Sequence, residues 1–171
     1  IVVALGVVDD LIDLDWLTKL SGQFIAAGVV AWQGVQIVSI PVGGITLFSP
    51  TLSLVLTVLA IVLVMNAVNF IDGLDGLAAG VALISNAVFF LYALVLSLGE
   101  GGTPYFGLAT LLAVLLAGSL LGFLPLNWHP AKLFLGDSGA LLVGLIMSVS
   151  AISVTGQIDP GAISPTQLLP A

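Results

Sequence analysis

The sequence between residues 66 and 78 reads Asn66-Ala67-Val68-Asn69-Phe70-Ile71-Asp72-Gly73-Leu74-Asp75-Gly76-Leu77-Ala78, and two long apolar runs, 51–65 and 77–98, flank it. Its two carboxylates are spaced i, i+3, so they point the same way on a helix or a single turn. Its glycines let the backbone turn sharply and let a ligand approach closely. Taken alone, the stretch is equally consistent with an acidic turn between two membrane helices and with a functional site.

The composition indicates an integral membrane protein. The 171 residues are 60% hydrophobic and only 6% charged, whereas a soluble domain carries about 25% charged residues. The net charge of -7 therefore reflects a few acids held at particular places. The sequence has no arginine and only two lysines, which argues against nucleic acid as a partner. It has no cysteine, which excludes disulfides and thiolate metal sites.

The apolar runs predict an all-α, polytopic transmembrane helix bundle that forms a single domain over residues 1–171. A span needs about 20 apolar residues. Residues 1–8 are typical of the end of a helix, and the sequence then predicts about five full spans: 17–40, 51–69, 77–98, 105–124 and 139–156. Because the chain starts at Ile1 with a run too short to span, we expect it to be a fragment of a larger bundle.

Counting the crossings predicts that three acidic segments share one face of the bundle. These segments are 9–15, 72–75 and the loop 126–137, whereas Glu100 and Asp159 fall on the other face. Both lysines, Lys19 and Lys132, lie on the acidic face, which the positive-inside rule makes cytoplasmic.

The acidic face has the groups that phosphoryl transfer requires. Asp9 and Asp10 lie beside Asp13 on a helix, and like charges at a membrane surface are costly unless a cation offsets them. Mg²⁺ is such a cation, because it binds one or two carboxylates and keeps positions open for substrate phosphate. Asp137 stands just before a span, where free N–H groups favour an anion. Metal-assisted charge neutralisation and positioning are the core of phosphoryl transfer.

Each of these signals also has a simpler explanation. Asp137 could cap the helix that follows it. His129 has no second histidine nearby, which weakens a role as a metal ligand. Lys19 fits a phosphate contact and, equally, a lysine that snorkels to the membrane interface.

Three motifs together resemble a known family. In chain order they are Val8-Asp9-Asp10-Leu11-Ile12-Asp13, residues 66–78, and Asn127-Trp128-His129-Pro130-Ala131-Lys132-Leu133-Phe134-Leu135-Gly136-Asp137-Ser138-Gly139. They resemble the polyprenyl-phosphate N-acetylhexosamine-1-phosphate transferases, whose superfamily also contains the phospho-muramoyl-pentapeptide translocase. The resemblance implies a Mg²⁺-dependent enzyme of the plasma membrane, with Mn²⁺ as an alternative ion. It would transfer a sugar-1-phosphate from a UDP-N-acetylhexosamine to undecaprenyl or decaprenyl phosphate, release UMP, and serve cell-envelope assembly, with a homodimer as one candidate assembly.

The resemblance also implies roles for individual residues. The catalytic set is Asp9, Asp10, Asp72, Asp75 and Asp137, with Asp10 and Asp137 as metal ligands and one of the paired aspartates as a base. The residues implied for nucleotide binding are Asn69, Asn127 and Phe134, with Phe134 as a stacking platform. Lys19 and His129 are candidate phosphate contacts.

Departures from the family pattern refine these expectations. Asp13 stands where the pentapeptide translocases carry a lysine, which favours the branch that acts on UDP-N-acetylglucosamine or a similar sugar. The family's first spans and its His-rich cytoplasmic loop are absent, so we expect the 171 residues alone to be inactive. Two alternatives remain: a transporter, whose carboxylates should lie near mid-span, and a degenerate, non-catalytic relative.

Overall fold

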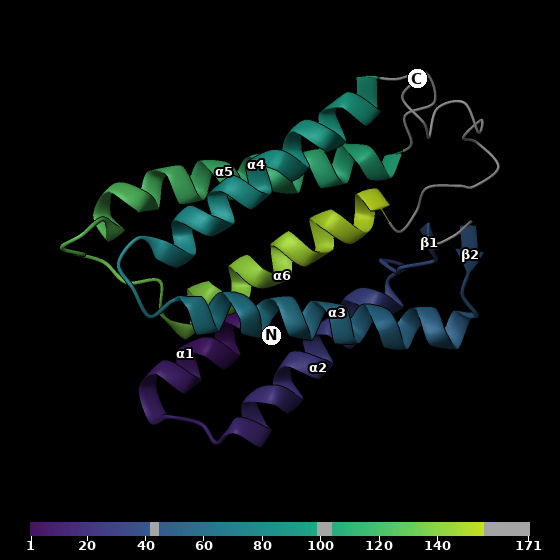
Figure 1. The fold of residues 1–171 in the computed structure, drawn as a ribbon. Coiled ribbons are helices and arrows are strands. Elements are labelled where there is room, and N and C mark those ends of the chain that lie inside the picture. Colours follow the sequence, from purple (N-terminus) through teal and green to yellow (C-terminus); the bar gives the residue numbers. More distant parts are fainter. Residues whose placement is uncertain (42–44, 99–103, 156–171) are drawn as a thin grey trace.

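The computed structural model describes residues 1–41, 45–98 and 104–155, and confirms the predicted helical membrane bundle (Figure 1). In chain order the elements are α1 (Val2–Ile12), α2 (Trp16–Trp32), β1 (Ser39–Pro41), β2 (Ile45–Leu47), α3 (Pro50–Ile71), α4 (Leu77–Leu98), α5 (Pro104–Asn127) and α6 (Gly136–Thr155). The two short strands pair in antiparallel register, with Ile40 opposite Thr46. Glu100 and Asp159, which were expected on the other face, lie outside the described residues.

Four helices are long and apolar enough to cross a membrane within the described part of the chain: α3, α4, α5 and α6. Large apolar side chains point outward from them, for example Leu63 at 71% and Ile84 at 69% exposure. Such a surface suits contact with lipid, and a helix satisfies its own backbone hydrogen bonds there.

The run 17–40 is helical over only part of its length. Helix α2 ends at Trp32, and Gly34 follows with a φ of 98°, a left-handed conformation that glycine adopts readily. The Gln36 side chain then donates a hydrogen bond of 3.0 Å to the Ala31 carbonyl, which also accepts the Gly34 backbone N–H at 3.2 Å. The polar residues within this run, rather than its overall hydropathy, decide where the helix stops.

Beyond α2, the chain continues in extended form along α3. The Ile37 backbone N–H donates to the Thr57 hydroxyl at 2.8 Å, and the Ser53 hydroxyl donates to the Ile37 carbonyl at 2.8 Å. Ser53 and Thr57 are both buried. They replace the helical partners that this segment lacks, which a buried backbone needs.

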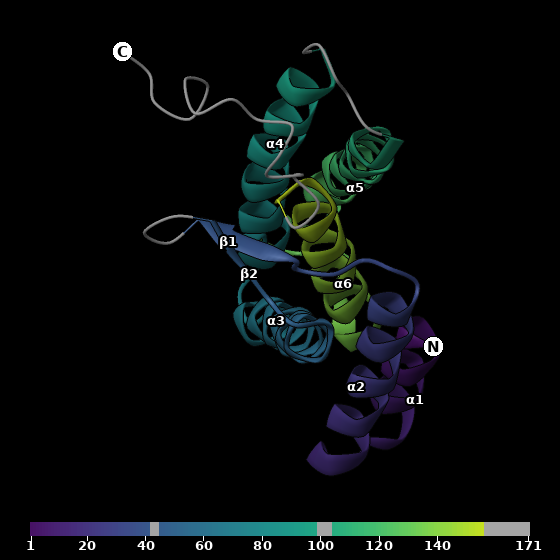
Figure 2. The ribbon, with the colours of Figure 1, turned by 90° about the vertical axis from the view of Figure 1, so that its right-hand side faces the viewer.

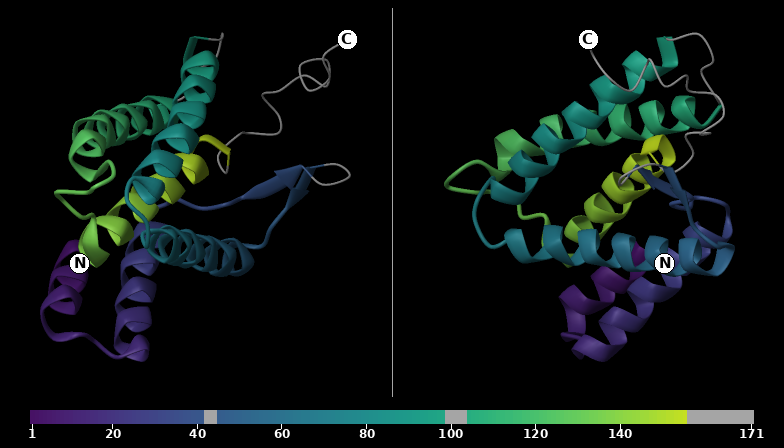
Figure 3. Two further views of the ribbon diagram at one scale, coloured as in Figure 1. Left: turned by 60° about the vertical axis from the view of Figure 1, so that its left-hand side comes forward. Right: turned by 45° about the vertical axis from the view of Figure 1, so that its right-hand side comes forward.

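Helix α6 is the centre of the bundle. It packs against α1, α3, α4 and α5, while α2 packs against α1 and α3 (Figure 1). In the end-on view of Figure 2, α4 and α5 lie on one side of α6, and α1 and α2 lie on the other. Figure 3 shows the hairpin of α1 and α2 beside α3, with the β strands at the other end of the molecule from the 128–135 loop.

Three pairs of small residues have the spacing of close helix contacts, but only one pair makes such a contact among the described residues. The pairs Gly76/Gly80, Gly118/Gly122 and Ala140/Gly144 all have the four-residue spacing of membrane helix contacts. Of these, the last pair makes the tight contact: Ala140 is fully buried, and a Cβ at Gly144 would lie 2.6 Å from Met65 Cα on α3. Added Cβ atoms at Gly80, Gly118 and Gly122 would meet nothing within 4 Å.

We therefore expect Gly144→Ala to destabilise the bundle, by the ~1–3 kcal/mol typical of an overpacked core. The matched control is Gly118→Ala, which adds the same methyl group in open space and should be neutral or stabilise by up to ~1 kcal/mol through helix propensity. Unfolding in detergent, followed by circular dichroism, measures both. Equal stability of the two variants would contradict the assigned α3–α6 contact.

Candidate active site

The three acidic segments meet at one end of the bundle, as the crossing count predicted. Asp9 lies in the last turn of α1, Asp137 in the first turn of α6, and Asp72 directly after α3. The chain turns sharply after α1, where Asp13 has a φ of 51°, and Asp15 then caps α2 by accepting the Thr18 N–H. This turn directs α2, and with it Lys19, back toward α1.

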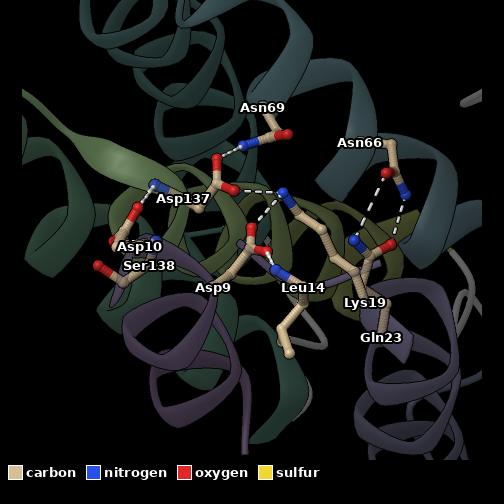
Figure 4. A network of polar contacts seen from close by, with 9 residues as sticks. All are labelled: Asp9, Asp10, Leu14, Lys19, Gln23, Asn66, Asn69, Asp137 and Ser138. Carbon is tan, nitrogen blue, oxygen red and sulfur yellow. Dashed lines mark hydrogen bonds and ion pairs between the residues drawn. The ribbon is translucent and has the colours of Figure 1, made fainter. Parts of the chain in front are cut away.

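Lys19 lies between two carboxylates (Figure 4). Its ammonium is 2.6 Å from Asp9 Oδ2 and also contacts Asp137 Oδ2. The Asp9 side chain is only 6% exposed, and its other oxygen accepts the Leu14 N–H at 2.9 Å. The Lys19 side chain is 20% exposed and points into the bundle. Lys19 is thus held by two carboxylates inside the bundle, and its predicted phosphate contact stays a prediction.

Asp137 receives two donors from two other helices. Lys19 reaches Oδ2, and Asn69 donates to Oδ1 at 2.5 Å. The carboxylate therefore faces α2 and α3 and is not a cap for its own helix. Each oxygen has a different partner, which fixes the orientation of the carboxylate plane.

Asp10 caps α6 from a different helix. Its carboxylate accepts the Asp137 N–H at 3.1 Å and the Ser138 N–H at 3.5 Å. The sequence predicted that these N–H groups would be free to bind an anion such as phosphate. In the structure they bind the Asp10 carboxylate instead. Gly136 makes the contact feasible, because its φ is 66° and a Cβ there would lie 3.2 Å from the Asp10 carboxylate.

The Asp72 carboxyl is partly buried beside Asp137. Burial raises the pKa of its carboxyl, and the nearby charge of Asp137 raises it further. Both effects disfavour the charged form of Asp72, and burial is the larger of the two. Within the described residues, Lys19 is the one lysine that contacts the group Asp9, Asp10, Asp72 and Asp137.

Asp75 binds the loop rather than the Lys19 cluster. Its carboxylate accepts the Ala131 N–H at 3.0 Å and lies 2.9 Å from His129 Nδ1. The hydrogen bond from the Ala131 N–H holds the pKa of Asp75 below its usual range, and the His129 side chain contributes to a smaller extent. The predicted set is thus divided: Asp9, Asp10, Asp72 and Asp137 gather around α6, while Asp75 pairs with His129.

The remaining predicted residues lie in or beside the same loop. Asn127 is 3% exposed, accepts the Gly76 N–H at 3.0 Å and donates to the Leu133 carbonyl at 2.9 Å. Phe134 is 70% exposed and so presents an open ring face. Asn127 joins the two loops, and Phe134 is available for stacking.

Sequence reasoning missed Gln23. It is 1% exposed on α2 and pairs with Asn66 on α3. The available signal was a polar residue one turn from Lys19 in an apolar helix, because polar groups inside membrane helices are costly and commonly functional.

No three His, Asp or Glu side chains are grouped to hold a metal ion by themselves in the described residues. Mg²⁺ at phosphate sites usually has one or two carboxylate ligands together with water and substrate phosphate. The metal-ligand role of Asp10 and Asp137 stays a prediction.

A family model described as glycosyl transferase family 4 matches residues 1–155. The chain belongs to this family. The match covers all three acidic motifs and confirms the resemblance drawn from them.

Several curated members of the family are similar to this chain. The decaprenyl-phosphate N-acetylglucosaminephosphotransferase of Mycolicibacterium smegmatis is 40% identical over 95% of this chain and 41% of its own length. A probable undecaprenyl-phosphate N-acetylglucosaminyl 1-phosphate transferase of Bacillus subtilis is 37% identical over 91% of this chain and 41% of its own length. The phospho-N-acetylmuramoyl-pentapeptide-transferase of Moorella thermoacetica is 41% identical over 78% of this chain and 42% of its own length. The chain thus spans about two fifths of the length of these relatives.

We predict that the two hydrogen bonds of Asn127 hold the loops on either side of it together. Asn127→Ala removes the partners of the Gly76 N–H and the Leu133 carbonyl, and two hydrogen bonds at ~0.5–1.5 kcal/mol each predict a loss of ~1–3 kcal/mol in stability. Hydrogen exchange should accelerate in residues 73–77 and 128–135. Ser119→Ala is the control, because Ser119 is exposed on the same helix and bonds only its own helix at Leu115. Unchanged exchange in both loops would refute the bridging role.

Proposed function

We propose that this protein transfers N-acetylglucosamine-1-phosphate, or a closely related hexosamine phosphate, from a UDP-sugar to polyprenyl phosphate and releases UMP. The names of the relatives support this substrate class, and Asp13 in place of lysine favours the N-acetylglucosamine branch. The reaction would take place at the cytoplasmic face of the plasma membrane and would begin the assembly of a cell-envelope glycan. A homodimer stays a prediction, which light scattering in detergent would test.

One observation carries the proposal: Lys19 joins Asp9 and Asp137, which are 128 residues apart in the sequence, at the end where Asn69 and Asp72 also lie. These carboxylates stand at helix ends rather than near mid-span, which disfavours a transporter. Asp9, Asp10 and Asp137 are all present, which disfavours a degenerate relative.

The residues present fit a divalent cation. The cluster supplies carboxylate oxygens, the ligands that Mg²⁺ prefers, and among the described residues its four carboxylates contact a single lysine. Asp10 and Asp137 would hold the ion, and both would have to exchange part of their present hydrogen bonding to do so. When bound, Mg²⁺ would supply neutralisation of the charge that develops on the transferred phosphoryl group.

The chain's own residues would position the substrates. In the net reaction, an oxygen of the lipid phosphate forms a bond to the sugar-bearing phosphorus. The bond from that phosphorus to the bridging oxygen breaks, and UMP leaves with the electron pair. Lys19 would attract the phosphates, and Asp9 or Asp10 would accept any proton carried by the attacking phosphate. Phe134 would stack on the uracil, and Asn127 would hold the loop that carries Phe134.

Asp137→Asn tests the proposal directly. The substitution keeps the size of the side chain and removes the charge that would hold the cation. We expect UMP release to fall by about 10²-fold or more, as when a charge-stabilising group is lost. The assay uses membranes that contain the whole gene product that includes these 171 residues, with UDP-N-acetylglucosamine, polyprenyl phosphate and Mg²⁺. Asp15→Asn is the matched control and should keep turnover near the parent value, because Asp15 is exposed and asparagine caps a helix as well as aspartate does.

Two results of this assay would count against the proposal. Absence of a lipid-linked sugar phosphate from the parent protein would reject the transferase activity. Normal turnover of Asp137→Asn at saturating Mg²⁺ would reject the metal role.

Phe134→Ala should act mainly on nucleotide binding. A stacking platform contacts the ground state and the transition state alike, so KM should rise while kcat changes little. Leu133→Ala is the matched control, because Leu133 is also exposed in the same loop. A fall in kcat with unchanged KM would contradict the stacking role.

A further inference from the structure

Gln23 and Asn66 form a reciprocal amide pair between α2 and α3 (Figure 4). Gln23 Nε2 donates to Asn66 Oδ1 at 3.4 Å, and Asn66 Nδ2 donates back to Gln23 Oε1 at 2.5 Å. Asn66 Nδ2 also donates to the Val62 carbonyl at 2.8 Å, which ties the amide to its own helix. The pair is therefore a fixed connection between two helices.

This pair lies about one helical turn deeper in the bundle than the two donors of Asp137. Gln23 follows Lys19 by four residues on α2, and Asn66 precedes Asn69 by three residues on α3. These spacings place each pair on one face of its helix, with axial offsets of about 6 Å and about 4.5 Å. The face of α2 that carries Gln23 thus also carries Lys19, and the face of α3 that carries Asn66 also carries Asn69. Lys19 and Asn69 bind the Asp137 carboxylate.

The other directional contacts between this part of the chain and α3 lie beyond the end of α2, where Gln36 and Ile37 bond Ser53 and Thr57. Within the helices themselves, one buried apolar cluster includes Ala26 and Ala27 on α2 and Val62 and Met65 on α3. Apolar contacts of this kind are non-directional, so sliding one helix along the other changes them little. An amide pair is directional, and one polar pair within an apolar helix interface is known to specify register.

We propose that Gln23 and Asn66 are positioning residues that set the axial register of α2 against α3, so that Lys19 and Asn69 reach the two oxygens of Asp137 together. The geometric part stands without the proposed function. The catalytic consequence, a loss of turnover when the register is lost, rests on the proposed function.

Three variants separate register from simple stability. Gln23→Asn shortens one partner and opens the pair. The swap Gln23→Asn with Asn66→Gln restores the combined length and both amides. Gln23→Met with Asn66→Leu replaces both amides by apolar groups of similar size, which keeps the bundle folded but removes the directional bonds. Ser21→Ala, at an exposed position on α2, is the matched control, and thermal unfolding confirms that each variant is folded.

The first readout is the reactivity of Lys19 toward acetic anhydride, measured by mass spectrometry relative to Lys132. The chain has only these two lysines, and Lys132 is exposed, so it serves as an internal reference. Lys19 is shielded by its two carboxylates, so the Lys19/Lys132 ratio should be low in the parent and in Ser21→Ala. It should rise several-fold in Gln23→Asn and in the apolar pair, and return to the parent value in the swap. A parent-like ratio in Gln23→Asn, or a swap no closer to the parent than Gln23→Asn, would overturn the proposal.

The second readout is turnover in the membrane assay described above. We expect kcat of the folded apolar pair to fall about 10²-fold, the loss that a misplacement of about 1 Å can cause, and the swap to recover it. Parent-like kcat in the apolar pair would overturn the catalytic part. If no variant and no parent sample shows transfer while the labelling ratios change as expected, the proposed function fails and the register assignment stands.

Discussion

The contact of Lys19 with Asp9 and Asp137 is the interaction on which the polar end of this protein depends. It joins α1, α2 and α6, three helices whose apolar faces alone would not specify how their ends meet. Asp9 is almost fully buried, and a buried carboxylate needs a partner, because removing one member of such a pair costs ~3–5 kcal/mol. The ammonium therefore does more than balance charge: it decides which ends of the three helices lie together.

A second constraint comes from backbone rather than charge. Gly6 on α1 lets that helix approach Ser138 so closely that a Cβ would lie 2.2 Å from the Ser138 Cα. Gly144 allows the corresponding approach of α6 to α3. These glycines bring α1 against the first turn of α6 and α3 against its middle. The carboxylate of Asp10 can then reach the helix start at Gly136, where another glycine leaves room for it.

The donors around Asp137 explain how a site with so few cations keeps its shape. Asn69 and Lys19 each take one carboxylate oxygen, and Asp10 accepts the backbone N–H of the same residue. Asp75 and His129 form a second polar centre, separate from the first centre around Lys19 and Asp137. The loop that follows Asn127 connects the two centres. Each of the two centres has one basic side chain and at least one carboxylate.

The sequence by itself determined the membrane class, the family and the end of the bundle at which the acids lie. Composition, span length and the order of three motifs are local properties that need no coordinates. Only the tertiary structure decided how the acids are partnered: Asp10 caps a distant helix, Asp75 joins His129, Lys19 turns inward, and α2 stops at Trp32. It also decided which small residues matter and that Gln23 meets Asn66. These outcomes depend on the relative rotation and register of helices, and because apolar faces are non-directional, a hydropathy pattern does not fix either one.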